Sequence, residues 1–163
     1  PTFRPDALLK IDQTETWNAW VDRLGAAADT DISTFNDLLS AFESRHEFFH
    51  QNGCRLSDHG LPQATASFCS QEETARIFDR ARSGVPVDPD EQQKFATAIM
   101  VRSGQLDAQK GWVKQLHLGP MRNNSSRAFR TLGPDTGFDS IGDYPQAEKL
   151  SRYLDALDLE FGK

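Results

Sequence analysis

Two polar residues, Asp58 and His117, stand where the sequence predicts that strands end. Asp58 begins the polar cluster 58–60, which follows the short strand-like stretch 54–57. His117 lies near the end of residues 112–118, which start with β-favouring residues and have alternating apolar positions. A carboxylate whose pKa is raised by burial can transfer protons, and an imidazole can bind hydroxyl groups or polarise a carbonyl. The pair predicts acid–base chemistry, because working residues collect where parallel strands end.

Two other groups of titratable residues are weaker candidates for a metal site. His46 and His50 have the i, i+4 spacing of helical metal ligands, but they fall on a helix that already has an apolar face, which favours a structural role. Asp135, Asp139 and Asp143 recur every four residues. They lack the alternating ligands and terminal Glu of an EF-hand loop, so we interpret them as turn-stabilising carboxylates.

Five helices are expected to position these residues. The second helix has candidate caps in Asp31 and Ser33, and Gly53 ends it, while Gly111 closes the fourth. The long polar connection 121–143 has the composition of a functional loop, and the last helix is expected to bury Leu154 with its other apolar residues. The expected helices centre on residues 17–24, 35–49, 77–78, 90–110 and 145–161.

The order of these elements indicates the fold class. Strand, helices, strand and helix follow one another, which is typical of parallel βα units joined by crossovers. We therefore expect an α/β fold that is rich in helix and has a few parallel strands.

Composition and charge exclude several classes of protein. The 163 residues are 37% hydrophobic and 26% charged, as in an ordinary single domain. A net charge of -6 and a pI near 5.2 argue against nucleic acid, whose partners carry a basic field. The sequence has neither an apolar run of membrane-spanning length nor the pattern of a signal peptide at its start. We expect a cytoplasmic protein that has no membrane partner and keeps Cys54 and Cys69 as core thiols.

Four segments, taken together and in this order, resemble the uronate isomerase (glucuronate isomerase) family of the amidohydrolase superfamily. They begin with Pro-Thr-Phe-Arg-Pro-Asp at 1–6 and Gly-Cys-Arg-Leu-Ser-Asp-His-Gly-Leu at 53–61. The others are 111–124 and the Gly-rich loop 132–143. Because helices of suitable length separate the segments, the resemblance extends over essentially the whole chain.

The resemblance implies a fold and a cofactor. It implies that residues 1–163 form a single segment, the central part of a distorted (β/α)₈ or TIM-like barrel, with a helical insertion at about 62–110. It also implies a divalent metal, zinc, held by a His-X-His pair and an Asp near the two ends of the family sequence. This chain has no His-X-His. We therefore expect the metal ligands outside this chain, and we assign no residue of it as a metal ligand.

The resemblance also implies roles for four residues. Arg4 matches the Arg-Pro-Asp motif, where a guanidinium can pair with a substrate carboxylate, and Arg122 follows on a loop that can reach the same pocket. Asp58 and His117 are the expected catalytic residues, for proton transfer and for binding hydroxyls or polarising a carbonyl. The alternatives are a surface arginine at position 4, a helix-capping or turn role for Asp58, and a structural role for His117 in the core. His59 should point away from Asp58 if the segment is extended.

Three hypotheses about function remain. The first is a uronate isomerase segment that converts D-glucuronate to D-fructuronate, or D-galacturonate to D-tagaturonate, through an enediol. Taken alone it is expected to be an incomplete, inactive portion that forms a homo-oligomer or associates through exposed strand edges. The second is a non-catalytic helical association module derived from the family. The third, a hydrolase of the same superfamily, is weaker because the motifs resemble the isomerases specifically.

Overall fold

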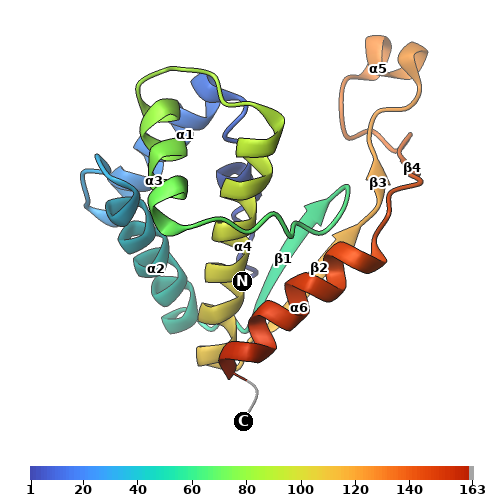
Figure 1. Cartoon of the computed structure of the whole chain (residues 1–163). Helices are drawn as coiled ribbons and strands as arrows, with labels where there is room; N and C mark the ends of the chain where they lie inside the picture. The colour runs from blue at the N-terminus through green and yellow to red at the C-terminus, as the bar shows by residue number, and fades with distance from the viewer. Residues whose placement is uncertain (162–163) are drawn as a thin grey trace.

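The computed structural model describes residues 1–161, and it has the expected helix-rich α/β fold with few strands (Figure 1). None of the helices within these residues combines the length and apolarity that crossing a bilayer needs. The elements in chain order are η1 (Asp6–Leu9), α1 (Thr14–Ala28), α2 (Phe35–Gln51), β1 (Leu56–Leu61), α3 (Gln71–Arg82), α4 (Pro89–Lys110), β2 (Val113–Leu118), β3 (Pro120–Met121), α5 (Ser126–Leu132), β4 (Ser140–Ile141) and α6 (Ala147–Phe161).

Three parallel segments run side by side, with β1 in the middle. β1 pairs in parallel with β2, in a register that sets Asp58 against Gln115 and Gly60 against His117. On the other edge of β1, Phe3 forms a parallel bridge with Ser57. The Asp58 N–H donates to the Phe3 carbonyl at 3.0 Å. This register brings the residue after Phe3 beside Asp58.

The two faces of this small sheet have different surroundings. Along β2 exposed and half-buried residues alternate, because successive side chains of a strand point to opposite faces. Val113, Gln115 and His117 point to the open face. Lys114 points to the other face, where it contacts α4. Helices therefore cover one face of the sheet, and the other is exposed.

Asp58 lies inside a strand rather than after one, which corrects the expectation from sequence. β1 begins at Leu56 and continues through Asp58, His59 and Gly60 to Leu61. The polar side chains there gave the appearance of a loop. The backbone stays extended because it pairs with β2 along its whole length, so the polar residues alternate between the two faces. His117 is the next-to-last residue of β2, as expected.

The helices form where apolar periodicity placed them, with two local corrections. Thr34 caps α2 in a capping box with Asp37, rather than Asp31 or Ser33. In α6 Tyr153 is buried and Leu154 is 53% exposed, because α6 packs on α4 through the face that carries Tyr153. The expected core position of Phe161 lies outside the described side chains. Gly111 ends α4, as expected, and its backbone has the left-handed conformation.

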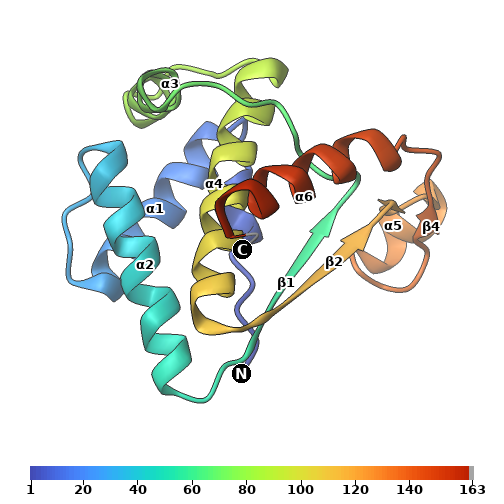
Figure 2. The same ribbon diagram turned by 60° about the horizontal axis from the view of Figure 1, so that its bottom comes forward.

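Residues 120–141 form an arm that stands away from the helical body in both views (Figures 1 and 2). Two short antiparallel strands, β3 and β4, lie at its base, and α5 lies at its tip. The long polar connection therefore contains regular structure, which its composition did not indicate. Leu132 and Ile141 are exposed apolar residues of this arm.

Candidate functional site

The open face of the sheet brings Arg4, Asp58 and His117 together. Arg4 NH1 lies 3.0 Å from Asp58 Oδ2, and His117 Nδ1 lies 2.9 Å from Asp58 Oδ1. The Phe3–Ser57 bridge positions Arg4, and the pairing of Gly60 with His117 positions the imidazole. The carboxylate thus lies between a guanidinium and an imidazole that come from its two neighbouring segments.

Asp58 is the buried member of this group. Its side chain is 11% exposed, whereas the side chains of Arg4 and His117 are 46% and 50% exposed. The His117 ring is at ion-pair distance from Asp58 Oδ1 but is not aimed for a hydrogen bond. Within the described residues, this oxygen accepts no hydrogen bond although it is buried. Buried carboxylate oxygens normally have a donor, so Asp58 Oδ1 has capacity for one more partner.

Gly60 makes room for two arginines on the same face. A Cβ atom at Gly60 would lie 2.5 Å from Arg4 NH2 and 3.6 Å from Arg122 NH2. Glycine is therefore required for the Arg4 side chain to lie as it does. The NH2 groups of both guanidiniums lie above one point of β1, and within the described residues neither donates to a protein acceptor.

Arg122 is held by the arm. Its NH1 donates to Asp139 Oδ2 at 2.6 Å, and the Asn123 N–H donates to the other carboxylate oxygen at 2.9 Å. The bond from Asn123, and then that from Arg122, hold the pKa of Asp139 below its usual value. Asp139 therefore orders the loop. No group of three potential ligands occurs within residues 1–161, so Asp135 and Asp143 form no metal cluster there.

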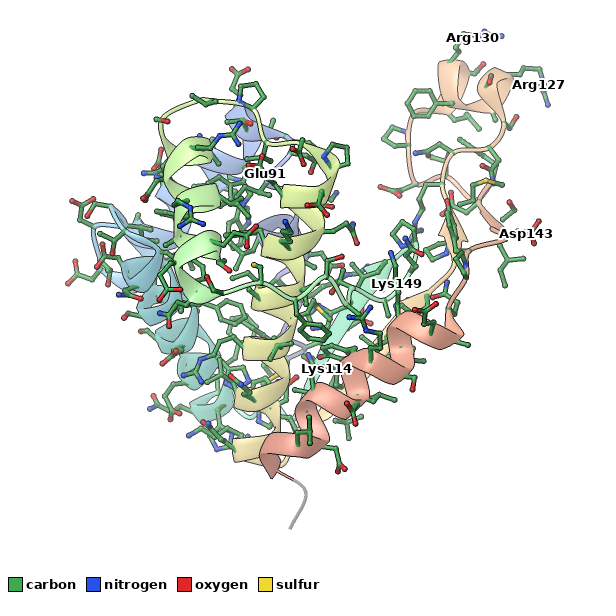
Figure 3. The ribbon with its side chains drawn as sticks, in the orientation of Figure 1. Glu91, Lys114, Arg127, Arg130, Asp143 and Lys149 are labelled. Atoms are coloured by element: carbon green, nitrogen blue, oxygen red, sulfur yellow. The ribbon has the colours of Figure 1, made fainter. Side chains whose placement is uncertain are left out.

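The covered face of the sheet holds a buried polar network that the sequence reasoning did not foresee. Lys114 Nζ lies 2.9 Å from His59 Nε2 and 2.8 Å from Asp107 Oδ2. It also donates to Ser57 and to Ser103. Figure 3 shows Lys114 in the space between β2, α4 and α6. The signal was present, since Lys114 is the one charged residue on the face that it shares with Trp112, Leu116 and Leu118.

Burial shifts the ionisation of this network. It lowers the pKa of His59, against the opposing hydrogen bond to Asp6, and lowers the pKa of Lys114, against the opposing charge of Asp107. For Asp107, burial alone would raise the pKa. The hydrogen bond from His46 and the Lys114 charge outweigh it, so that the pKa lies below its usual value. Burial therefore favours the neutral form of His59, whose ring lies between the Asp6 carboxylate and Lys114 Nζ.

Asp6 connects the two faces of the sheet. Its Oδ1 lies 3.1 Å from His59 Nδ1, and its Oδ2 accepts from the Gly60 N–H at 2.9 Å and from Arg4 Nε at 3.1 Å. Burial would raise the pKa of Asp6, but the bonds from His59 and Gly60 lower it below its usual value. His59 itself points away from Asp58, as expected for an extended segment.

The two histidines of α2 are occupied by the core. His46 Nε2 lies 2.9 Å from Asp107 Oδ1, and its ring stacks on Trp112 with centroids 4.0 Å apart. His50 Nδ1 accepts from Trp112 Nε1 at 2.9 Å. Both side chains thus have structural partners, in agreement with the preferred interpretation of their spacing.

A cavity beside Arg4 does not coincide with this site. A cavity of about 260 Å³ lies between α1, α2 and the N-terminal segment, and its lining includes Phe3, Arg4 and Trp20. Neither Asp58 nor His117 lines it. The four predicted site residues therefore meet on the open face of the sheet, outside this cavity apart from Arg4.

Comparisons with known proteins agree on one family. The family model described as glucuronate isomerase matches residues 1–161. Uronate isomerases from Solibacter usitatus and Opitutus terrae are 58% and 53% identical, over 98% and 97% of this chain and 34% of each relative. The crystal structure of uronate isomerase from Thermotoga maritima superposes with a TM-score of 0.88 at 33% identity, over 97% of this chain and 35% of that one. The chain spans about a third of the length of the curated relatives it matches.

Proposed function

We propose that this chain, which belongs to the glucuronate isomerase family, supplies the carboxylate-binding and acid–base groups of a uronate isomerase. The reaction interconverts D-glucuronate and D-fructuronate, or D-galacturonate and D-tagaturonate. A proton leaves C2 and one is added to C1, while the O2 hydroxyl loses its proton and the C1 oxygen gains one. Such an exchange through an enediol needs a positioned acid–base group and a cation for the distant carboxylate.

One observation carries this proposal: two guanidiniums and a buried carboxylate share one small surface. The NH2 groups of Arg4 and Arg122 both lie above Gly60. A uronate carboxylate placed there would accept charge-assisted bonds from both arginines. The remaining sugar chain would then run along the sheet toward Asp58 and His117.

Asp58 is the proposed acid–base group. Arg4 holds its Oδ2, which fixes the orientation of the carboxylate, and its Oδ1 is the buried oxygen that accepts no hydrogen bond within the described residues. A substrate hydroxyl, or a proton on the carbon beside the carbonyl, would find an acceptor there. A fixed orientation and an available oxygen are the geometric requirements of proton transfer.

His117 is the proposed partner of the substrate oxygens. Gln115 Nε2 donates to His117 Nε2 at 2.5 Å, which leaves Nδ1 as the nitrogen that carries the ring proton. Nδ1 lies 2.9 Å from Asp58 Oδ1 but is not aligned for a hydrogen bond to it. Gln115 is exposed. A substrate hydroxyl or carbonyl that displaces Gln115 would therefore meet an imidazole already positioned beside the carboxylate.

The metal implied by the family does not fit the described residues alone. No group of three or more His, Cys, Asp or Glu side chains within residues 1–161 could hold an ion. The roles proposed above therefore use only this chain's own side chains. The parallel order of the Phe3 segment, β1 and β2 supports our proposal that residues 1–163 form the central part of a TIM-like barrel. Residues 62–110, which contain α3 and α4, would be its helical insertion.

A second candidate is the association module. Leu132 is 62% exposed and Ile141 is 85% exposed on the projecting arm, and exposed apolar groups favour contact with another surface. Within the described residues β2 also has no partner on its outer edge. Association and catalysis are compatible, but only catalysis accounts for the convergence of Arg4, Asp58 and His117.

Kinetics with the complete gene product test the proposal. Arg122→Met should raise KM for D-glucuronate by about tenfold, as expected for the loss of a charged hydrogen bond. Arg130→Met, at the far tip of the same arm (Figure 3), is the control and should leave KM unchanged. Equal KM values for the two variants would contradict a carboxylate site at Arg122.

A further inference from the structure

A continuous line of polar contacts runs from the buried face of the sheet to the candidate site. It starts at α2, crosses the helical face of the sheet and emerges at its open face. His59 and Asp107 are 0% and 2% exposed, so most of this line lies out of reach of solvent. In order, its members are His46, Asp107, Lys114, His59, Asp6 and Arg4.

Both ring nitrogens of His59 are in use, and their partners define which nitrogen carries the proton. The Lys114 ammonium has only donors, so His59 Nε2 must accept from it at 2.9 Å. The Asp6 carboxylate has only acceptors, so His59 Nδ1 must donate to it at 3.1 Å. Lys114 therefore selects the Nδ1–H form of His59.

Asp6 links His59 to Arg4 through its two carboxylate oxygens. Its Oδ1 receives the His59 proton, and its Oδ2 receives both the Gly60 N–H and Arg4 Nε. The carboxylate thus cannot rotate without breaking three contacts. With Nε held by Asp6 and NH1 held by Asp58, the guanidinium plane of Arg4 is fixed and its NH2 lies above Gly60.

We infer that His59 and Lys114 are positioning residues for Arg4, which act through Asp6 to hold the guanidinium in the geometry that binds the substrate carboxylate. The inference rests on the proposed function, because it assigns Arg4 to that carboxylate. Neither residue touches the open face. His59 instead adjoins Asp58 in sequence and serves the same site from behind the sheet.

A purely structural role explains this arrangement less well. Buried charges are costly to desolvate, and well-packed apolar residues often replace a buried ion pair without loss of stability. A fold that needed only stability would have no use for the connection from Lys114 through His59 to Asp6. The line ends at a half-exposed arginine of the candidate site, which is where positioning has value.

A matched pair of variants separates positioning from packing. In His59→Asn the side-chain amide nitrogen takes the place of Nδ1 and can still donate to Asp6. In His59→Gln the amide reaches the place of Nε2, beside Lys114, and the bond to Asp6 is lost. His50→Gln is the control, because His50 contacts Trp112 and Arg55 and lies outside the line.

Steady-state kinetics of the complete gene product with D-glucuronate give the readout. His59→Gln should raise KM about tenfold, with a smaller change in kcat. KM of His59→Asn should be clearly lower than that of His59→Gln, with at least about a third of the tenfold increase removed. KM of His50→Gln should match that of the wild type. Equal KM values for the Asn and Gln variants, or an unchanged KM in His59→Gln, would overturn the inference.

Two further measurements keep the result decisive. Arg4→Met should itself raise KM for D-glucuronate, and an unchanged KM in this variant would contradict the proposed function. If Arg4→Met raises KM but His59→Gln leaves KM unchanged, only the positioning role is contradicted. If the variants do not fold, nitrogen-15 spectra of histidine-labelled wild-type protein decide. They should show His59 with its proton on Nδ1, and a proton on Nε2 would overturn the inference.

Discussion

The two faces of the sheet around β1 carry polar residues of the same kinds, but these residues differ in how fully they are hydrogen-bonded. On the covered face, Lys114 lies among His59, Asp107 and two serine hydroxyls, and each contact is a hydrogen bond or an ion pair. On the open face, Asp58 keeps a buried oxygen that accepts no hydrogen bond within the described residues. The covered face has the properties of a scaffold, and the open face has those of a site with capacity for a ligand.

This difference predicts that substitutions on the two faces act first on different properties. Groups that still have an unused hydrogen-bonding position should affect activity strongly and stability little. Groups whose capacity is fully used should matter for stability first, because their loss leaves a buried partner uncompensated.

The largest expected effect is on the open face. Asp58→Asn in the complete gene product should lower kcat for D-glucuronate isomerisation by about 10²- to 10⁴-fold, since the acid–base group is lost. Its unfolding midpoint should stay near that of the wild type. Asp155→Asn, an exposed aspartate on α6, is the control. An Asp58→Asn enzyme with wild-type kcat would remove Asp58 from the chemistry.

The next effect is on the covered face. Lys114→Met should lower the free energy of unfolding by about 3–5 kcal/mol, because Asp107 is left buried without its cation. Urea titration measures this, with the exposed Lys10→Met as the control. A loss of unfolding free energy under about 1 kcal/mol would show that the buried network does not depend on Lys114 and would contradict the proposed difference between the faces.

A smaller effect tests the join between the faces. Gly60→Ala should displace the Arg4 guanidinium, because the new Cβ would lie 2.5 Å from Arg4 NH2. KM for D-glucuronate should rise by about three- to tenfold, the equivalent of about 1 kcal/mol. Gly84→Ala is a poor control because Gly84 has φ +83°. Ser67→Ala, in the connection between β1 and α3, is better. An unchanged KM in Gly60→Ala would show that Arg4 needs no such space.

The smallest effect is on pH dependence. Burial lowers the pKa of His59, so the unfolded chain binds its proton at higher pH than the folded chain does. Stability should therefore fall as pH drops below about 6.5, and His59 alone contributes at most about 1.4 kcal/mol per pH unit to this fall. His50 adds to this slope, since burial also lowers its pKa. His59→Gln should flatten the slope while Asp6, Asp107 and Lys114 stay in place; an unchanged slope would mean that His59 is protonated in the fold.

The sequence was sufficient for the elements whose signal is local. Apolar periodicity predicted α1 and α2, and a glycine at the end predicted where α4 stops. The motif matches predicted Arg4, Asp58, His117 and Arg122, and the structure places all four on the open face.

What the sequence did not predict depends on contacts across the chain. The strand at 56–61 exists because β2 pairs with it, although its polar residues resemble a loop. Asp6 and Lys114 were missed because their partners lie 53 residues or more away along the chain or on another element. A lysine on an otherwise apolar strand face was the only local sign that a buried partner had to exist.

The most direct test of the site is a crystal structure of the complete gene product with D-glucuronate bound. The substrate carboxylate should lie about 3 Å from the NH2 groups of Arg4 and Arg122, above Gly60, with a sugar hydroxyl on Asp58 Oδ1. A sugar bound elsewhere, or with its carboxylate turned away from both arginines, would contradict the site.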